Sequence, residues 1–105
     1  MDERAIGFLE VYGLCCALMA ADAGCKAADV TLEPFDKNKP ANADSLPVPL
    51  LVTIKFRGTV ANVTAAVEAG REMAESLSGV VVSHVIPRPT EETIKMMPIN
   101  GFDVD

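Results

Sequence analysis

The residue types best suited to catalysis or metal binding are few in this sequence, and they do not converge. His84 is the only histidine, and no cysteine or carboxylate near it completes a metal-ligand set or a catalytic triad, so we interpret it as structural. Cys15, Cys16 and Cys25 fall in a segment rich in alanine, leucine and methionine, where free thiols usually pack in a core as small hydrophobic side chains. We therefore expect no catalytic residue, no metal site and no cofactor.

Three other features are better suited to binding than to catalysis. Asp22 and Lys26 are four residues apart, the spacing of a surface ion pair on a helix. Arg88 lies between two prolines, whose restricted backbones would hold its side chain in a fixed place, although a solvated arginine is the plainer alternative. Leu46-Pro47-Val48-Pro49 ends a polar stretch with an apolar one, which either lines a functional surface or only leads into the next strand.

Composition limits the class of protein and its partners. A length of 105 residues suits one domain, and 50% hydrophobic residues with only 5% aromatic ones favours thin packed layers over an aromatic ligand pocket. The formal net charge of −6 argues against binding to nucleic acid or to an anionic membrane surface. The amino terminus lacks the pattern of a secretory signal, residues 11–21 are too short an uncharged run to span a bilayer, and an odd number of cysteines fits a reducing cytosol.

The first half of the chain reads as strand, helix, strand and loop. The apolar segment 4–12 predicts a buried strand, and residues 13–28, with strong helix formers and no proline, predict a helix. Residues 29–35 predict a short strand, and Pro34 near its end either places that strand at an edge of the sheet or stops it. The polar, proline-containing segment 36–49 predicts a long loop.

The second half begins with a clear strand and continues with an amphipathic helix. Over residues 50–57 every second residue is apolar, and the alternate side chains predict a face in contact with water, made of Thr53, Lys55 and Arg57. Thr59 is the expected N-cap of a helix that ends at Gly79. Its apolar side should carry Val60, Val63, Val67 and Leu77.

Gly70, inside that helix, costs about 1 kcal/mol against alanine, so it should allow a close approach to another backbone. Residues 80–86 predict a last strand, and residues 90–97 predict a short terminal helix. The element order predicts an α+β fold, a ferredoxin-like βαβ-βαβ arrangement with both long helices on one sheet face. We expect one domain over residues 1–98 and a tail over residues 99–105.

With these elements in place, the sequence resembles the hexamer-forming, single-domain shell proteins of bacterial microcompartments, from Ala5 to about Met97. The resemblance rests on residues 5–10 (Ala-Ile-Gly-Phe-Leu-Glu), 20–23 (Ala-Ala-Asp-Ala) with 26–30 (Lys-Ala-Ala-Asp-Val), 57–63 (Arg-Gly-Thr-Val-Ala-Asn-Val) and 84–89 (His-Val-Ile-Pro-Arg-Pro). It implies a structural role, with a homohexamer and other shell proteins as partners, and encapsulated enzymes as further ones. The location it implies is the shell of a microcompartment in the bacterial cytoplasm.

The resemblance also implies roles for individual residues. Lys26 and Arg88 would make the contacts between hexamers at their edges, and the loop with Leu46, Pro47, Val48 and Pro49 would line the central pore. Thr90 stands where the family usually has a histidine, so the edge geometry should differ.

The pore loop departs from the short, glycine-rich turn that is common in the family. Its proline-flanked form is similar to members associated with glycyl-radical enzyme compartments, in which a pore cysteine is proposed to hold an iron–sulfur cluster. Val48 stands at that place and cannot ligate iron, so we predict an apolar collar without a cluster.

Two other functions are kept as alternatives to the shell tile. One is an oligomeric binding module that holds a small ligand or an iron–sulfur centre at its symmetry axis. The other is a small enzyme that uses His84 with a nearby acid, which the lack of converging catalytic groups makes the weaker of the two.

Overall fold

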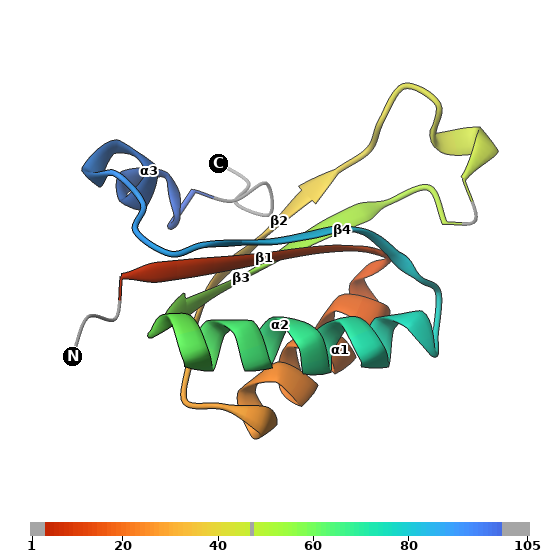
Figure 1. Cartoon of the computed structure of the whole chain (residues 1–105). Helices are drawn as coiled ribbons and strands as arrows, with labels where there is room; N and C mark the ends of the chain where they lie inside the picture. Colours follow the sequence, from red (N-terminus) through yellow and green to blue (C-terminus); the bar gives the residue numbers. More distant parts are fainter. Residues whose placement is uncertain (1–3, 47, 100–105) are drawn as a thin grey trace.

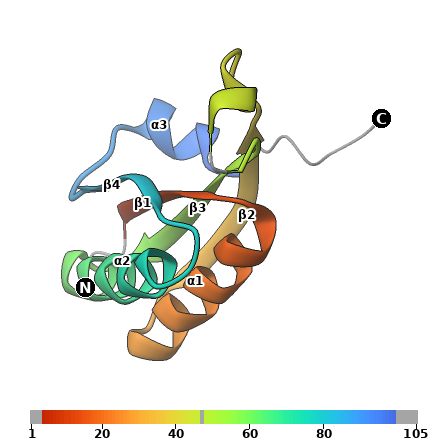
Figure 2. The same cartoon turned by 90° about the vertical axis from the view of Figure 1, so that its right-hand side faces the viewer.

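A four-stranded antiparallel sheet organises the chain, with two long helices on one face and a short helix on the other (Figures 1 and 2). This computed structural model describes residues 4–46 and 48–99, and its lateral strand order is β2-β3-β1-β4. The elements are β1 (Ala5–Tyr12), α1 (Leu14–Ala27), β2 (Thr31–Asn38), the 3-10 turn η1 (Ala43–Ser45), β3 (Leu51–Gly58), α2 (Val60–Glu75), β4 (Val80–Ile86) and α3 (Glu91–Met96). The predicted ferredoxin-like order is confirmed, with α1 and α2 on the same face of the sheet.

The main core lies between the sheet and the two long helices. Val52, Ile54 and Phe56 on β3 are fully buried, as the alternating pattern predicted, and Leu9 on β1 joins them. α2 contributes Val63 from its apolar side. These strands therefore bury one face against the helices, which is the usual outcome of a period-two apolar pattern.

Two glycines let α1 and α2 pack closely against each other. A Cβ atom at Gly70 would lie 3.0 Å from the carbonyl oxygen of Ala20, and one at Gly24 would lie 2.9 Å from that of Ala66. Both separations are tighter than ordinary carbon contacts, so a side chain at either position would push the helices apart. The close approach predicted for Gly70 is confirmed.

Strand β2 is longer than the sequence predicted, and of the two effects predicted for Pro34 the edge position is confirmed and the stop is wrong. The strand continues to Asn38 and pairs again with β3 from Asp36 onward, after a register shift between Glu33 and Asp36. Pro34 falls within that shift, and β2 lies at an edge of the sheet. An edge strand tolerates a proline at such an irregularity, since no ladder hydrogen bond is needed from its nitrogen.

The cysteines do not share one environment, so the prediction that they pack in the core holds only in part. Cys16 is buried, but Cys15 and Cys25 are exposed. α1 buries only the side that meets the sheet and α2, and neighbouring positions on a helix point in different directions. Val60, the first residue of α2, and Leu77, which follows that helix, are also exposed although their pattern predicted the apolar side.

The predicted water-facing side of β3 is wrong at Lys55, which is buried. Its Nζ atom donates to the carbonyl oxygen of Met97 at 2.8 Å and to that of Ile99 at 2.6 Å. The cause is tertiary, since the segment after β4 folds back over this face of the sheet (Figure 2). Burial lowers the pKa of Lys55, and the charges of Asp36 and Glu33 oppose that shift.

Threonine side chains cap α2 and α3. The hydroxyl oxygen of Thr59 accepts from the amide of Asn62 at 3.2 Å, as the sequence predicted. The hydroxyl of Thr90 accepts from the amide of Thr93 in the same way at the start of α3. Each cap satisfies an amide that has no partner within its helix. Among the described residues, no helix combines the length and the apolar character needed to cross a bilayer.

Candidate functional site

The residues singled out by the sequence lie at two opposite ends of the sheet. The loop between β2 and β3 projects from one end, and η1 lies within it (Figure 1). The last turn of α1 and the turn that follows β4 lie at the other end. Lys26 belongs to the first of these turns and Arg88 to the second, so the fold brings these two residues to the same end and keeps them away from Val48.

The loop is tied to the start of α1. The amide of Gly13 donates to the carbonyl oxygen of Leu50 at 2.8 Å, and Val48 lies beside Gly13, with its Cγ1 atom 3.4 Å from where a Cβ would stand. Leu46 and Val48 are half-buried and Pro49 is exposed. Pro47, the fourth predicted pore residue, lies outside the described residues. The loop therefore has an apolar base rather than a fully solvated one.

An apolar hollow of about 450 Å³ lies beside the base of this loop. Its walls include Leu14 and Met19 of α1, Val48 of the loop and Leu77 after α2. Leu14, Met19 and Leu77 are each more than 40% exposed. Large apolar side chains gathered on a surface are typical of contacts between proteins, and the polar groups that fix a small ligand do not converge here.

Lys26 is held in place by its own helix. Its Nζ atom lies 2.7 Å from Oδ2 of Asp22, and the two side chains are 75% and 60% exposed. The hydrogen bond to Asp22, together with the charge of that carboxylate, raises the pKa of Lys26, so the ammonium stays charged. The same carboxylate adds to the effect of burial in raising the pKa of the Cys25 thiol. The geometry is the surface pair that the spacing predicted.

Arg88 is exposed in the turn between β4 and α3. Pro89, which follows it, is buried and fixes the turn to the body of the protein. Among residues 4–46 and 48–99, no hydrogen bond or ion pair to the Arg88 guanidinium is found. Its donors are therefore available to acceptors on another molecule, and a proline on each side limits where the side chain can reach.

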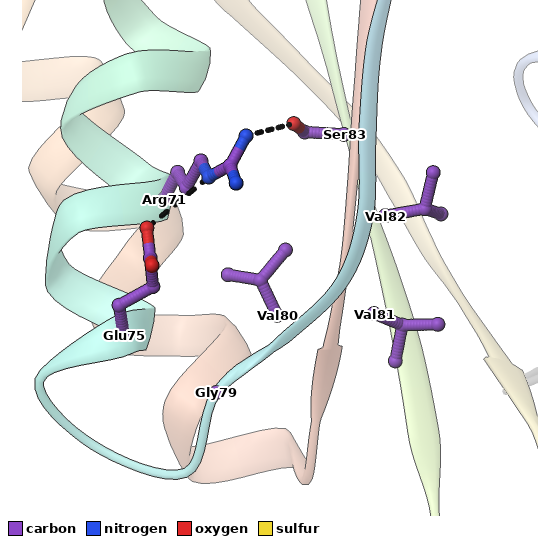
Figure 3. A pocket seen from close by; sticks show the side chains of 7 residues that line it. All are labelled: Arg71, Glu75, Gly79, Val80, Val81, Val82 and Ser83. Atoms are coloured by element: carbon purple, nitrogen blue, oxygen red, sulfur yellow. Dashed lines mark hydrogen bonds and ion pairs between the residues drawn. The ribbon is translucent and has the colours of Figure 1, made fainter.

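The described residues do not bring a catalytic group together. His84 is exposed on the edge strand β4, and no cluster of three or more metal-ligating side chains lies within residues 4–46 and 48–99. An open hollow of about 380 Å³ between α2 and β4 holds Arg71, whose Nε lies 3.1 Å from Oε1 of Glu75 and whose Nη1 lies 3.2 Å from Oγ of Ser83 (Figure 3). These contacts join the helix to the strand and activate no nucleophile.

Comparison with known proteins places this geometry among shell proteins. The family model described as "BMC domain" matches residues 5–89. The bacterial microcompartment shell protein PduA of Citrobacter freundii is 38% identical over 98 residues, covering 93% of this chain and 96% of that protein. The carboxysome shell protein CcmK2 of Synechococcus elongatus is 36% identical over 97 residues, covering 90% and 86%.

A solved structure gives the same result for the fold. A microcompartment protein from Desulfitobacterium hafniense DCB superposes with a TM-score of 0.70 at 26% identity. The alignment covers 98% of this chain and 51% of that one, so this chain spans about half the length of the solved protein.

Proposed function

Because the chain belongs to the BMC domain family of microcompartment shell proteins, we propose that it forms cyclic homohexamers that tile into a shell with a pore at each hexamer centre. A structural shell subunit is what the family match and the related shell proteins support. One observation carries the finer proposal: the proline-flanked loop lies at one end of the sheet, and Lys26 and Arg88 lie together at the opposite end (Figure 1). A tile needs such a separation, since one end must face the axis and the other must face the neighbouring tile.

In the proposed ring, the loop end of each copy faces the six-fold axis. Leu46, Pro47, Val48 and Pro49 would then line the pore, and symmetry would repeat each side chain six times. A collar of Val48 side chains would be apolar and would hinder hydrated ions, as hydrophobic constrictions do in channels. The base of the loop, which is apolar around Val48 and Gly13, supports this arrangement.

The flanks of each copy would meet its neighbours in the ring. β4 forms one edge of the sheet, and its seven residues include no charged side chain, while Val81 and Val82 are 41% and 53% exposed. An uncharged edge strand with exposed valines lacks the usual protection against pairing with another chain. The opposite edge, β2, is protected by Pro34 and by charged residues. This contrast supports self-association through the β4 flank.

Contacts between hexamers would use the other end. Lysine stems of adjacent tiles can lie along one another while their ammonium groups stay in water. Arginine offers several donors in a rigid fork, which suits the carbonyl oxygens of a facing tile. The exposed Lys26 and the unpaired Arg88 fit these two roles.

The remaining parts of the proposal concern partners and location. We place the protein in the shell of a microcompartment in the bacterial cytoplasm, where other shell proteins would share its lattice and the enzymes enclosed by it would be neighbours. A catalytic role is not part of the proposal. The association with glycyl-radical enzyme compartments stays a prediction based on the proline-flanked loop.

Truncating one side chain distinguishes the formation of the ring from the formation of the lattice. Lys26→Ala should leave hexamers intact in native mass spectrometry and should abolish extended sheets in electron micrographs. Lys95→Ala is the matched control, because Lys95 is also an exposed lysine near the end of a helix but lies on α3. It should form sheets like the unmodified protein.

Each part of the proposal has its own contrary result. A monomer at micromolar concentration in the unmodified protein would refute the ring. Hexamers whose sheets survive Lys26→Ala would leave the ring standing and would show that the lattice contact lies elsewhere.

A further inference from the structure

The short helix α3 is the least integrated element of the described chain. None of its residues is buried, and no Cα atom of α3 lies within 8 Å of one in another helix or strand among the described residues. A cavity of about 220 Å³ separates it from the sheet, with walls that include Phe8, Lys55, Thr93 and Ile99. α3 therefore stands over this face of the sheet without packing tightly on it.

The helix is nevertheless well formed by local interactions. Thr90 caps its first turn, Glu91 and Glu92 lie at its amino-terminal end, and Lys95 lies at its carboxyl-terminal end. These choices suit the helix dipole at both ends. The shape of α3 is thus set by its own residues, and its position must be set by something else.

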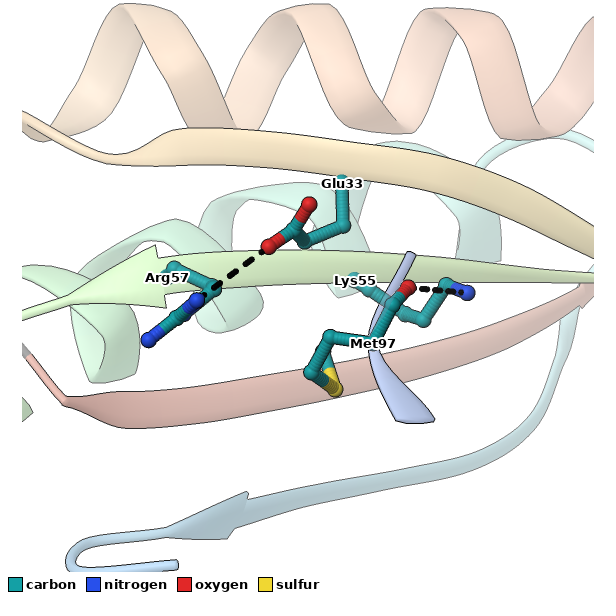
Figure 4. Close-up of polar contacts among 4 residues, drawn as sticks. All are labelled: Glu33, Lys55, Arg57 and Met97. Atoms are coloured by element: carbon teal, nitrogen blue, oxygen red, sulfur yellow. Dashed lines mark hydrogen bonds and ion pairs between the residues drawn. The ribbon is translucent and has the colours of Figure 1, made fainter. Parts of the chain in front are cut away.

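Lys55 supplies the directional contacts that hold α3 in position. The ammonium donates to the carbonyl oxygen of Met97 at 2.8 Å (Figure 4) and to that of Ile99 at 2.6 Å, and both residues follow α3. The Met97 side chain is the buried apolar contact of this segment, at 2% exposure. A second charged contact of this segment, Arg4 with Glu91 at 3.7 Å, joins two side chains that are more than half exposed, and such pairs are weak.

We propose that residues 90–99 form a strap that Lys55 latches onto the sheet and that opens as a unit while the sheet, α1 and α2 stay folded. The buried Pro89 is the fixed end of the strap, and the two carbonyl oxygens are its latched end. Opening uncovers Phe8 and Lys55 at the floor of the cavity. This inference goes beyond the shell role and does not depend on it.

The latch is a charged ammonium held by two carbonyl oxygens, and both hydrogen bonds require the docked strap. Burial alone would favour the loss of its charge, as the lowered pKa of Lys55 indicates. In the docked state two charge-assisted hydrogen bonds offset the cost of burying the charge. Both hydrogen bonds are lost when the strap opens. Removing the ammonium therefore removes the directional part of the docking and leaves the main core unchanged, because Lys55 does not belong to it.

Hydrogen exchange with mass spectrometry on the purified protein tests the strap. In Lys55→Met, which keeps an unbranched side chain, amides of residues 91–99 should exchange about tenfold faster or more, the effect of losing hydrogen bonds to a charged group. Amides of α1, α2 and β1 should stay within about twofold of the unmodified protein. Lys95→Met, which removes an exposed lysine from the strap itself, should leave the second set unchanged and speed the first by no more than about two- to fivefold, the effect of one charge at a helix end.

Two results in the Lys55→Met variant would overturn the proposal. Unchanged protection of residues 91–99 in Lys55→Met would show that Lys55 is not the latch, and faster exchange throughout α1 and α2 would show that it supports the whole fold. The unmodified protein provides a measurement that does not depend on the variant. Its α3 amides should be less protected from exchange than those of β1, and the free energy of the opening that exposes them should depend less on urea. Equal protection of the two sets would refute a separate strap.

Discussion

Replacing Gly70 with alanine measures how closely α1 and α2 are packed. In a free helix the change should stabilise the protein by about 1 kcal/mol, because alanine has the higher helix propensity. Here the new Cβ would lie 2.9 Å from Cδ2 of Leu9 and 3.0 Å from the carbonyl oxygen of Ala20, and overpacking of this kind costs about 1–3 kcal/mol. The two effects leave a net loss of about 0–2 kcal/mol in the free energy of unfolding.

Urea unfolding followed by circular dichroism gives this free energy, provided that all variants are compared at one protomer concentration. Gly24→Ala is the graded comparison, because its Cβ would lie 2.6 Å from Cζ of Phe56 and 2.9 Å from the carbonyl oxygen of Ala66. Contacts closer than those at Gly70 should make Gly24→Ala the more destabilising of the two. A Gly70→Ala protein that is more stable by about 1 kcal/mol, as in an unconstrained helix, would refute the close-packing argument.

Two further predictions concern a helix cap and the pore. Thr59→Ala removes the acceptor of the Asn62 amide and should lower the free energy of unfolding by about 1 kcal/mol in the same assay. Thr59→Ser should restore most of the lost free energy. Equal stability of the two variants would show that the capping hydrogen bond does not stabilise the protein. Val48→Asp should keep hexamers but place six carboxylates at the proposed pore, so assembled shells should admit an anionic solute more slowly than a neutral one of equal size. Unchanged relative rates would place Val48 away from the path.

Sequence patterns predicted the fold wherever the signal was local. The strand at Val80–Ile86 is confirmed over the predicted residues, since β-branched residues there are bounded by Gly79 and Pro87. The helix that starts after Thr59 is confirmed for the same kind of reason, because its cap and apolar spacing lie within a few residues of each other. The surface pair of Asp22 and Lys26 also depends only on helix geometry.

The misses come from contacts between distant parts of the chain. Lys55 lies in a period-two pattern that indicates a face in contact with water. The carbonyl groups that bury it belong to residues 42 and 44 positions later in the chain, which the local pattern does not include. Pro34 is compatible with a strand end and with an edge strand, and only the strand order, which places β2 at an edge of the sheet, decides between the two. Cys15 and Cys25 look like core residues by composition, and only the packing of α1 on one side shows that they are exposed. Local patterns carry no information about which face a distant segment will cover.

The separation of the proposed pore from the proposed lattice contact follows from the order of the elements. Each of β1, α1, β2, β3, α2 and β4 runs back along the sheet against the one before it (Figure 1). α1 and β4 are the second and sixth in this series, so both must end where β1 begins, and the loop after β2, the third, must lie at the opposite end. Strands β2 and β3 have eight residues each, which places the two ends about 26 Å apart. Sites so far apart usually act independently, so the loop can change what a tile admits without changing how tiles meet.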